Sequence, residues 1–451
     1  MEINTEINNM NVKELKQYCR DNNIDGYSKL NKSELLDLIK SKDNDDEVKI
    51  LEKKIIKIKN KKRNSNQLKF VDLFCGIGGF HIALKKLGCE CVLACDIDKK
   101  CRETYIENFD IEPVEDVKKI NEKEMIDFDI LCAGFPCQPF SNGGNKKSFK
   151  DDRGLLFDEI IRIAKYKKPR FMFLENVKHI LKVSNGEVLE YIKQKIKDIG
   201  YTLQMFKMSP HDYGIPQQRE RIYFVCIRND IYNNNDINLF GENKNLTIDD
   251  IIKNNNDEYK IKGDIKEVLD AWNELIQQFE IGQKMSPTIL MHDYFKNYSD
   301  EEFEGLADWR RDYITKNKPL FAKYIHIIEP WYEKYKKILN KREIYGKLEW
   351  QVGHLKENDS IYNYSIQFRQ SGIRVKKTNY FPTLVAISQI PIYGKTQSYI
   401  TPRECARLQS FPEDYILDES DRVVYKQMGN SVNVHNVYTV INSTLKHYQL
   451  V

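Results

Sequence analysis

The sequence predicts an α/β fold built on a doubly wound parallel sheet, and three observations support this. Four apolar, β-rich runs follow one another after residue 68: "LKFVDLF", "CVLACDID", "FDILCAG" and "RFMFLENV". Helix-like stretches such as "GGFHIALKKLG" and "LLFDEIIRIAKYKK" lie between them, and this alternation is typical of a parallel sheet. Each run ends in chemically distinctive residues, at the edge where such sheets bind their ligands.

The composition is that of a soluble globular protein with two or three domains. Of the 451 residues, 41% are hydrophobic and 31% are charged, and no run reaches the roughly 18 apolar residues that span a bilayer. The first residues carry no signal pattern, so we expect a protein of the cytoplasm or nucleoid without a membrane partner. Ten scattered cysteines suit a reducing compartment. Cys89, Cys91 and Cys95 lack the usual paired spacing of zinc ligands, so we expect no metal.

Charge is unevenly placed along the chain. The net charge of +4 comes from 71 basic and 67 acidic residues, which permits an anionic partner without requiring one. The segment "KKIIKIKNKKR", residues 53–63, holds seven basic residues and no acidic one. It is either a solvated linker helix or an arm that contacts phosphates.

Residues 11–40 are predicted to form two short helices around a turn. Val12, Leu15 and Cys19 share one apolar stripe, and Leu35 and Leu36 belong to a second. The pattern resembles a SAP-type helix-turn-helix module, a unit often found binding DNA. A plain helical hairpin is the alternative.

Changes in composition and in the pattern of apolar residues divide the chain into five parts. Residues 229–385 are rich in Asn, Lys, Tyr and Trp, and their helix-like and irregular pieces show few clear strands, which favours a separate recognition domain. The predicted parts are a helical module (1–40), a charged linker (41–66), the α/β domain (67–228), the recognition domain (229–385) and a return to the α/β domain (386–451).

The first two strand ends predict a cofactor that contains adenosine. "DLFCGIGGF" places Gly76 and Gly78 between a strand and a helix, where backbone N–H groups can approach a ligand. Asp96 and Asp98 follow the next strand about twenty residues on, where an acid can bind ribose hydroxyls. The spacing G-x-G-G differs from the dinucleotide fingerprint, which argues against nicotinamide or flavin binding.

The next two strand ends supply a thiol and a carboxyl group. In "AGFPCQPFSNGG", prolines flank Cys137 and keep it out of regular structure, so it is either a buried thiol or a nucleophile. Glu175 ends the apolar run "FLENV", and burial there would raise its pKa toward values useful for proton donation. The alternative for Glu175 is a cap on the next helix.

Two arginines follow in "GIPQQRERIYFVCI". In an extended segment Gln217, Arg219 and Arg221 point to one face, whereas Glu220 points to the other. Paired arginines suit a phosphate or a base that carries a carbonyl group.

From residue 68 to its end the chain closely resembles DNA (cytosine-5) methyltransferases. The motifs that carry the resemblance occur in the family's order: "FCGIGG", "GFPCQPFS", "LENV", "PQQRER", "RECARLQSFP" and "QMGNSV". The unmatched stretch lies where the family keeps its variable target-recognition domain. The resemblance therefore implies a Rossmann-like methyltransferase domain with an inserted target-recognition domain and a small N-terminal helical module.

The resemblance also implies the reaction, which is methyl transfer from S-adenosylmethionine to C5 of a cytosine flipped out of a specific duplex DNA sequence. By analogy, Cys137 adds to C6 of the base, and Glu175 holds N3 and N4 and donates a proton at N3. Arg219 and Arg221 match the arginines that position the base through O2, and Asn176 holds the loop of Glu175. "FPTLVA", with Thr383 and Leu384, is expected to lie against DNA.

The cofactor positions are carried over from the same family. Asp116 follows Glu115, which could take its place, and Ile97 stands where some relatives carry an aromatic that stacks on adenine. The full set is Phe74, Gly76, Gly78, Asp96, Ile97, Asp116, Val117, Pro136, Leu156, Asn430 and Ser431.

Two alternatives to DNA methylation remain at this point. One is methylation of transfer RNA, and the other is a DNA-binding protein that has lost its activity. The long insert favours DNA, because sequence readout needs additional surface. The motif residues are all present, which favours an enzyme. We expect a monomer that acts on double-stranded DNA, with a cognate restriction endonuclease as its functional partner.

Overall fold

The computed structural model describes residues 67–136, 155–253, 257–285, 288–386 and 389–451, and isolated positions before residue 67. Cys137 and the basic run at residues 53–63 therefore lie outside the described residues. The chain divides into two compact units, Met1–Gln67 and Leu68–Val451, and each is described by itself. No helix in the described part of the chain combines the length and apolar character needed to cross a membrane.

In the first unit, Val12, Leu15, Cys19, Leu35 and Leu36 of the predicted apolar stripes are described, and all lie in helical segments. Leu15, Cys19 and Leu35 are fully buried. The backbone N–H of Leu35 donates to the carbonyl of Asn31, as in a helix.

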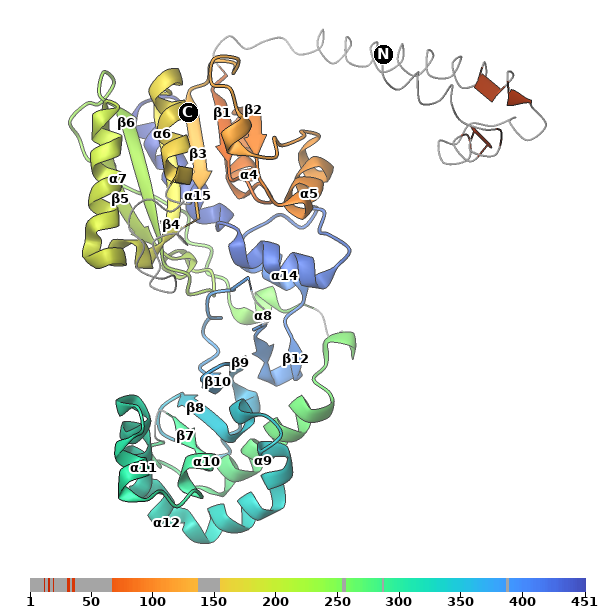
Figure 1. Cartoon of the computed structure of the whole chain (residues 1–451), viewed down its shortest axis with the longest axis vertical. Helices are drawn as coiled ribbons and strands as arrows, with labels where there is room; N and C mark the ends of the chain where they lie inside the picture. Colours follow the sequence, from red (N-terminus) through yellow and green to blue (C-terminus); the bar gives the residue numbers. More distant parts are fainter. Residues whose placement is uncertain are drawn as a thin grey trace. The chain divides into compact units, whose positions relative to one another are not determined.

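The second unit contains a six-stranded sheet in the order β2-β1-β3-β4-β6-β5 (Figure 1). The four predicted runs form its parallel strands, which are β1 (Lys69–Leu73), β2 (Glu90–Cys95), β3 (Ile130–Gly134) and β4 (Phe171–Val177). The α/β class is thus confirmed. The sheet is mixed, however, because β6 (Arg221–Arg228) runs antiparallel to both β4 and β5 (Tyr201–Met208). No α-helix separates β5 from β6, so the chain returns without a crossover.

Helices cover both faces of this sheet. Phe70, Phe173 and Tyr223 point into one buried cluster, and Val71, Leu174 and Phe224 point into the other, as alternation along strands requires. The C-terminal segment returns to this domain, and its last helix packs against the first helix after β1. The helices are α4 (Gly79–Lys86), α5 (Lys99–Phe109), α6 (Leu155–Lys167), α7 (Glu187–Asp198), α13 (Pro402–Leu408), α14 (Asp421–Asn430) and α15 (Val434–His447).

Residues 257–399 build a second six-stranded sheet, in the order β12-β11-β9-β10-β8-β7. The expectation of few clear strands was wrong, because the strands have only two or five residues each, too short for a visible alternation. They are β7 (Ile289–Leu290), β8 (Lys347–Gln351), β9 (Ser365–Arg369), β10 (Gly372–Lys376), β11 (Ile392–Tyr393) and β12 (Ser398–Tyr399). The last two follow residue 385, so this sheet extends beyond the predicted insert.

A separate apolar core holds the second sheet to its helices. Trp272 and Trp331 are buried with ring centroids 5.2 Å apart, and each indole N–H donates to a backbone carbonyl. Trp309, by contrast, is 55% exposed. The helices of this part are α8 (Ile248–Ile251), α9 (Gly263–Gln278), α10 (Met291–Tyr294), α11 (Asp300–Glu304) and α12 (Asp308–Leu339). Figure 1 shows the two sheets at opposite ends of this unit, with α8 and α14 between them.

Candidate active site

A glycine turn joins β1 to α4 at the carboxyl edge of the first sheet. Gly76 (φ 52°) and Gly78 (φ 82°) adopt the left-handed region that favours glycine. At Gly78 a Cβ would also lie 2.2 Å from the ring of Phe109. Because α4 begins directly after this turn, its first backbone N–H groups point at the sheet edge and can bind an anionic group.

Aromatic side chains support the turn from behind. The ring of Phe109 stacks on His81 at 3.9 Å between centroids. The Tyr415 hydroxyl donates to the carbonyl of Ile77 at 2.6 Å, and the Tyr105 hydroxyl lies 2.6 Å from Nδ1 of His81. Sequence analysis missed these residues because they act through packing and belong to no motif.

Asp96 ties the glycine turn to the end of β2. Its carboxylate accepts the N–H of Gly76 and the N–H of Asp98, each at 2.8 Å. Burial raises the pKa of Asp96, and the two N–H donors oppose that rise. The next side chain, Ile97, is 74% exposed. Asp98 caps α5 and pairs with the Lys426 ammonium at 2.7 Å.

The other predicted cofactor residues lie at nearby ends of elements. The Asp116 carboxylate accepts the N–H of Lys118, and Val117 is buried in the core. This segment lies beside β2, because the N–H of Asp96 donates to the carbonyl of Val114. Four further positions are Pro136 (exposed, after β3), Leu156 (half-buried, in α6), Asn430 (exposed, ending α14) and Ser431 (buried). Phe74 also adopts a positive φ, 54°, just before the glycine turn.

Glu175 lies in β4 with only 8% of its surface exposed. Burial raises the pKa of this carboxyl group, and the guanidinium groups of Arg221 and Arg219 oppose the rise. Nε of Arg221 lies 3.0 Å from Oε1 of Glu175. Gly134, at the end of the neighbouring strand β3, lies close to the same carboxyl group. If Gly134 carried a Cβ, that atom would be 3.9 Å from Oε2 of Glu175. Glu175 therefore borders the strand that leads to Cys137.

Arg219 binds backbone groups. Its guanidinium donates to the carbonyls of Leu384, Gly429 and Ser431 at 2.7–2.9 Å. Burial and the charge of Arg221 lower the pKa of Arg219 to about 9, which Glu175 partly opposes. The two predicted arginines thus have different partners, because Arg221 contacts Glu175 and Arg219 joins three chain segments.

The side-chain amide of Asn176 and the backbone of Gln217 and Gln218 support the same edge. Asn176 Nδ2 donates to the carbonyl of Phe135 at 2.9 Å, directly before Pro136. Gln217 is fully buried and bridges to Phe381, and the Thr383 hydroxyl donates to the carbonyl of Gln218 at 2.7 Å. The segment "FPTLVA" therefore lies against "PQQRER", residues 216–221, which we call the arginine segment.

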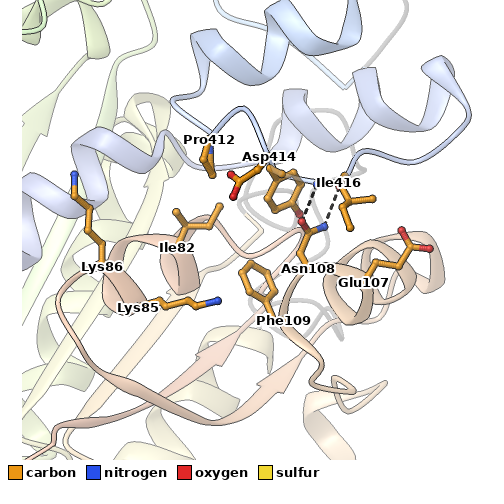
Figure 2. Close-up of a pocket in the computed structure, with 10 residues that line it drawn as sticks. Ile82, Lys85, Lys86, Glu107, Asn108, Phe109, Pro412, Asp414 and Ile416 are labelled. Carbon is orange, nitrogen blue, oxygen red and sulfur yellow. Dashed lines mark hydrogen bonds between the residues drawn. The ribbon is translucent and has the colours of Figure 1, made fainter.

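A cavity of about 370 Å³ lies between α4, the end of α5 and the loop at residues 412–416 (Figure 2). Phe109 and Tyr415, which support the turn, belong to its lining. The side-chain amide of Asn108 joins α5 to the loop after α13 through two hydrogen bonds to the backbone of Ile416, at 2.8 and 2.9 Å. The residues that line this cavity include none of the predicted site residues.

The sheet order, the glycine turn tied to an acid, and the buried Glu175–Arg221 pair define a methyltransferase-type α/β enzyme. The model of the C-5 cytosine-specific DNA methylase family matches residues 68–446. The chain belongs to this family and is a DNA (cytosine-5) methyltransferase, as its motifs predicted. The family model of the Rho termination factor N-terminal domain matches residues 6–44.

Known proteins resemble the chain over most of its length. Type II methyltransferase M.HhaI of Haemophilus parahaemolyticus is 32% identical over 386 residues, covering 84% of this chain and 94% of that protein. Type II methyltransferase M.BanI of Aneurinibacillus aneurinilyticus is 31% identical, covering 84% and 96%. The structure of the methyltransferase EhMeth of Entamoeba histolytica superposes with a TM-score of 0.51 at 18% identity, covering 85% of this chain and 99% of that one.

The buried His81 predicts a pH dependence of stability. Burial, assisted by the charge of Lys85, lowers the pKa of His81 to about 3 in the folded protein. In the unfolded chain its pKa is about 6.5, so the unfolded state binds an extra proton below that pH. We therefore expect His81 to remove about 2 kcal/mol from the free energy of unfolding between pH 7 and pH 5.

Urea unfolding at both pH values measures this contribution. His81→Phe should lose less stability than the wild type on acidification, whatever its own stability at pH 7. His179→Phe, at an exposed histidine, should keep the wild-type dependence. Equal losses in the wild type and His81→Phe would contradict the prediction.

Proposed function

We propose that this enzyme transfers a methyl group from S-adenosylmethionine to C5 of a cytosine flipped out of a specific duplex DNA sequence, through a covalent bond between Cys137 and C6. The observation that carries the proposal is the Glu175–Arg221 pair, buried at the sheet edge beside the strand that leads to Cys137. A buried carboxyl group with a raised pKa is suited to protonate a base held next to it.

The carboxyl edge of β1 and β2 fits S-adenosylmethionine, which supplies an electrophilic methyl group when bound. The glycine turn leaves backbone N–H groups at the start of α4 for a carboxylate, and Ile97 offers an exposed apolar surface to an adenine ring. Val117 has its side chain in the core, so its backbone would contact the adenine. The proposed set is Phe74, Gly76, Gly78, Asp96, Ile97, Asp116, Val117, Pro136, Leu156, Asn430 and Ser431.

The protein groups then have distinct roles in the reaction. The Cys137 thiolate adds to C6 while protonated Glu175 donates its proton to N3, which makes C5 nucleophilic. After C5 takes the methyl group, a base from solvent accepts the C5 proton as the Cys137 thiolate leaves, and N3 returns its proton to Glu175, which restores the aromatic ring. Arg221 orients the Glu175 carboxyl group and the base. Arg219 holds the surrounding backbone in place.

A paired cytosine cannot reach the sheet edge, so the base must leave the duplex, at a cost of a few kcal/mol. We assign sequence readout to the recognition domain at residues 229–385, whose junction with the catalytic domain lies at the arginine segment. Residues 67–228 and 386–451 would form the catalytic domain. We expect a monomer that acts inside the cell with a cognate restriction endonuclease, as the names of its Type II relatives suggest.

The substrate and the nucleophile can be tested together. With methyl-labelled cofactor, the wild type should label duplex DNA and leave transfer RNA unlabelled. Cys137→Ser should lose most transfer, because a hydroxyl at neutral pH is a much weaker nucleophile than a thiolate. Label found only in RNA would refute the substrate, and normal transfer by Cys137→Ser would refute the nucleophile.

Glu175→Gln should bind the cofactor normally yet transfer methyl groups about 10²- to 10⁴-fold more slowly, because an amide N–H is far too weakly acidic to transfer a proton to N3. Single-turnover rates and cofactor binding by calorimetry measure the two effects. Glu220→Gln is the matched control, because Glu220 pairs with Lys178 and Lys207 away from the site. An undiminished rate in Glu175→Gln would show that Glu175 is not the acid.

We propose that residues 1–66 add non-specific DNA affinity, with a helical module at 1–40 followed by the basic run in the linker. Deletion of residues 1–66 should weaken binding to non-specific duplex most at low salt. The slope of log K against log salt should become shallower by about 0.9 for each DNA phosphate that these residues neutralise. Deletion of residues 1–40 alone keeps the basic run and should retain more of that slope. Unchanged binding after the longer deletion would contradict this role.

A further inference from the structure

The side-chain amide of Gln427 joins α14 to α5. Gln427 lies in the last turn of α14 and is only 3% exposed. Its Nε2 donates to the carbonyl of Lys100 at 3.1 Å and to the hydroxyl of Thr104 at 3.0 Å. Only the NH2 group of an amide can donate to a carbonyl, so these bonds fix the orientation of the side chain.

Each of these helices lies next to part of the proposed cofactor site. α14 ends at Asn430, which lies three residues and about 4.5 Å along the helix axis beyond Gln427, and Ser431 follows. α5 begins directly after Asp98, whose backbone N–H donates to the Asp96 carboxylate at 2.8 Å. We call Asn430 and Ser431 the C-terminal half of the site, and Asp96 with the glycine turn its N-terminal half. Gln427 therefore joins the helices that adjoin the two halves.

Other hydrogen bonds to the end of α14 come from different parts of the fold. Arg219 donates to the carbonyls of Gly429 and Ser431. Gln409, directly after α13, donates to the carbonyl of Met428 at 2.7 Å. None of these bonds involves α5, so the position of α14 relative to α5 depends on other contacts.

An ion pair between the same helices is more exposed than the amide. The Lys426 ammonium lies 2.7 Å from the Asp98 carboxylate, and the lysine side chain is 56% exposed. Exposed ion pairs contribute little and are screened by salt. The bonds of Gln427 join neutral groups that are buried, so salt does not screen them.

We propose that Gln427 is a positioning residue for S-adenosylmethionine, because it holds the end of α14 against α5 and so brings the two halves of the cofactor site to the spacing that the cofactor needs. The inference rests on the proposed cofactor site. Gln427 acts through the two helices that it joins. Its loss should therefore weaken cofactor binding and leave the methyl-transfer step unchanged.

Gln427→Met tests this role with little change in packing, because methionine is an unbranched side chain of similar length. The substitution leaves no donor stranded, since the Thr104 hydroxyl still donates to the carbonyl of Lys100 at 3.1 Å. It also removes Oε1 of Gln427, a buried acceptor without a partner among the described residues. Calorimetry of the whole protein with S-adenosylmethionine should give a Kd about tenfold higher than that of the wild type.

Kinetics separate positioning from catalysis. Gln427→Met should raise KM for the cofactor about tenfold, whereas its single-turnover rate at saturating cofactor should stay within about twofold of the wild type. The ratio of the two Kd values should also be the same at low and high salt, because the lost bonds join neutral groups.

Gln204→Met is the matched control. Gln204 is a half-buried glutamine on β5, which lies at the opposite edge of the sheet from β2. Its side chain also makes two bonds to backbone groups, with the carbonyl of Asn235 at 3.1 Å and the N–H of Ile237 at 2.9 Å. Gln204→Met should therefore bind the cofactor as the wild type does, whatever its own stability.

Substitutions of Thr104 test the acceptor side of the same contact. Thr104→Val removes the hydroxyl that accepts one of the two bonds and should raise Kd about threefold. Thr104→Ser keeps the hydroxyl and should bind the cofactor normally. Thr104→Val also provides the test if Gln427→Met does not fold.

The outcomes distinguish this role from the proposed cofactor itself. A wild type that bound no S-adenosylmethionine would refute the cofactor, and the role of Gln427 with it. Normal binding by both the wild type and Gln427→Met would overturn the positioning role alone. An equal loss of affinity in Gln204→Met, or a slower single-turnover rate with unchanged Kd in Gln427→Met, would overturn it as well.

Discussion

The buried guanidinium of Arg219 is the interaction on which the rest of the site depends. It donates to the carbonyls of Leu384, Gly429 and Ser431, and so joins the arginine segment, the end of the insert and the turn between α14 and α15. Leu384 lies 165 residues from Arg219 in the chain, and the other two carbonyls lie farther still. The guanidinium is planar and its donors point in fixed, divergent directions, so it can reach carbonyls of three separate residues at once, whereas the donors of a lysine all lie on one nitrogen. The cost of burying its charge is visible in its lowered pKa.

Opposing electrostatic effects meet at Glu175. Burial favours the neutral acid, whereas Arg221 and Arg219 favour the carboxylate, and the net result is a raised pKa. Arg221 is also the group that contacts this carboxyl directly, with its Nε 3.0 Å from Oε1. The same opposition occurs at Asp96, where burial is countered by two backbone N–H donors.

Sequence patterns predicted much of the first sheet and little of the second. The runs that became β1 to β4 are apolar, uninterrupted and followed by helix signals, so local propensity and tertiary packing agree. The sequence did not predict that β6 runs antiparallel to β4, because the direction of a strand depends on how the chain connects it to its neighbours. Strands such as β7 and β11 carry two residues each, and their pairing comes from the shared core around Trp272 and Trp331. Strands of two residues are too short to produce an alternating pattern of apolar and polar residues in the sequence.

By itself, the sequence determined the α/β class, the family and the residue types at each strand end. Each of these three properties depends on short contiguous motifs. Only the tertiary structure decided how the motif residues are divided between tasks. Arg219 and Arg221 look equivalent in "PQQRER", yet one binds carbonyls and the other binds Glu175. Tyr223 and Asn436 belong to no motif, and they meet because α15 returns to the sheet beside β6. Contacts between distant segments depend on packing, and packing is not encoded in any single stretch of chain.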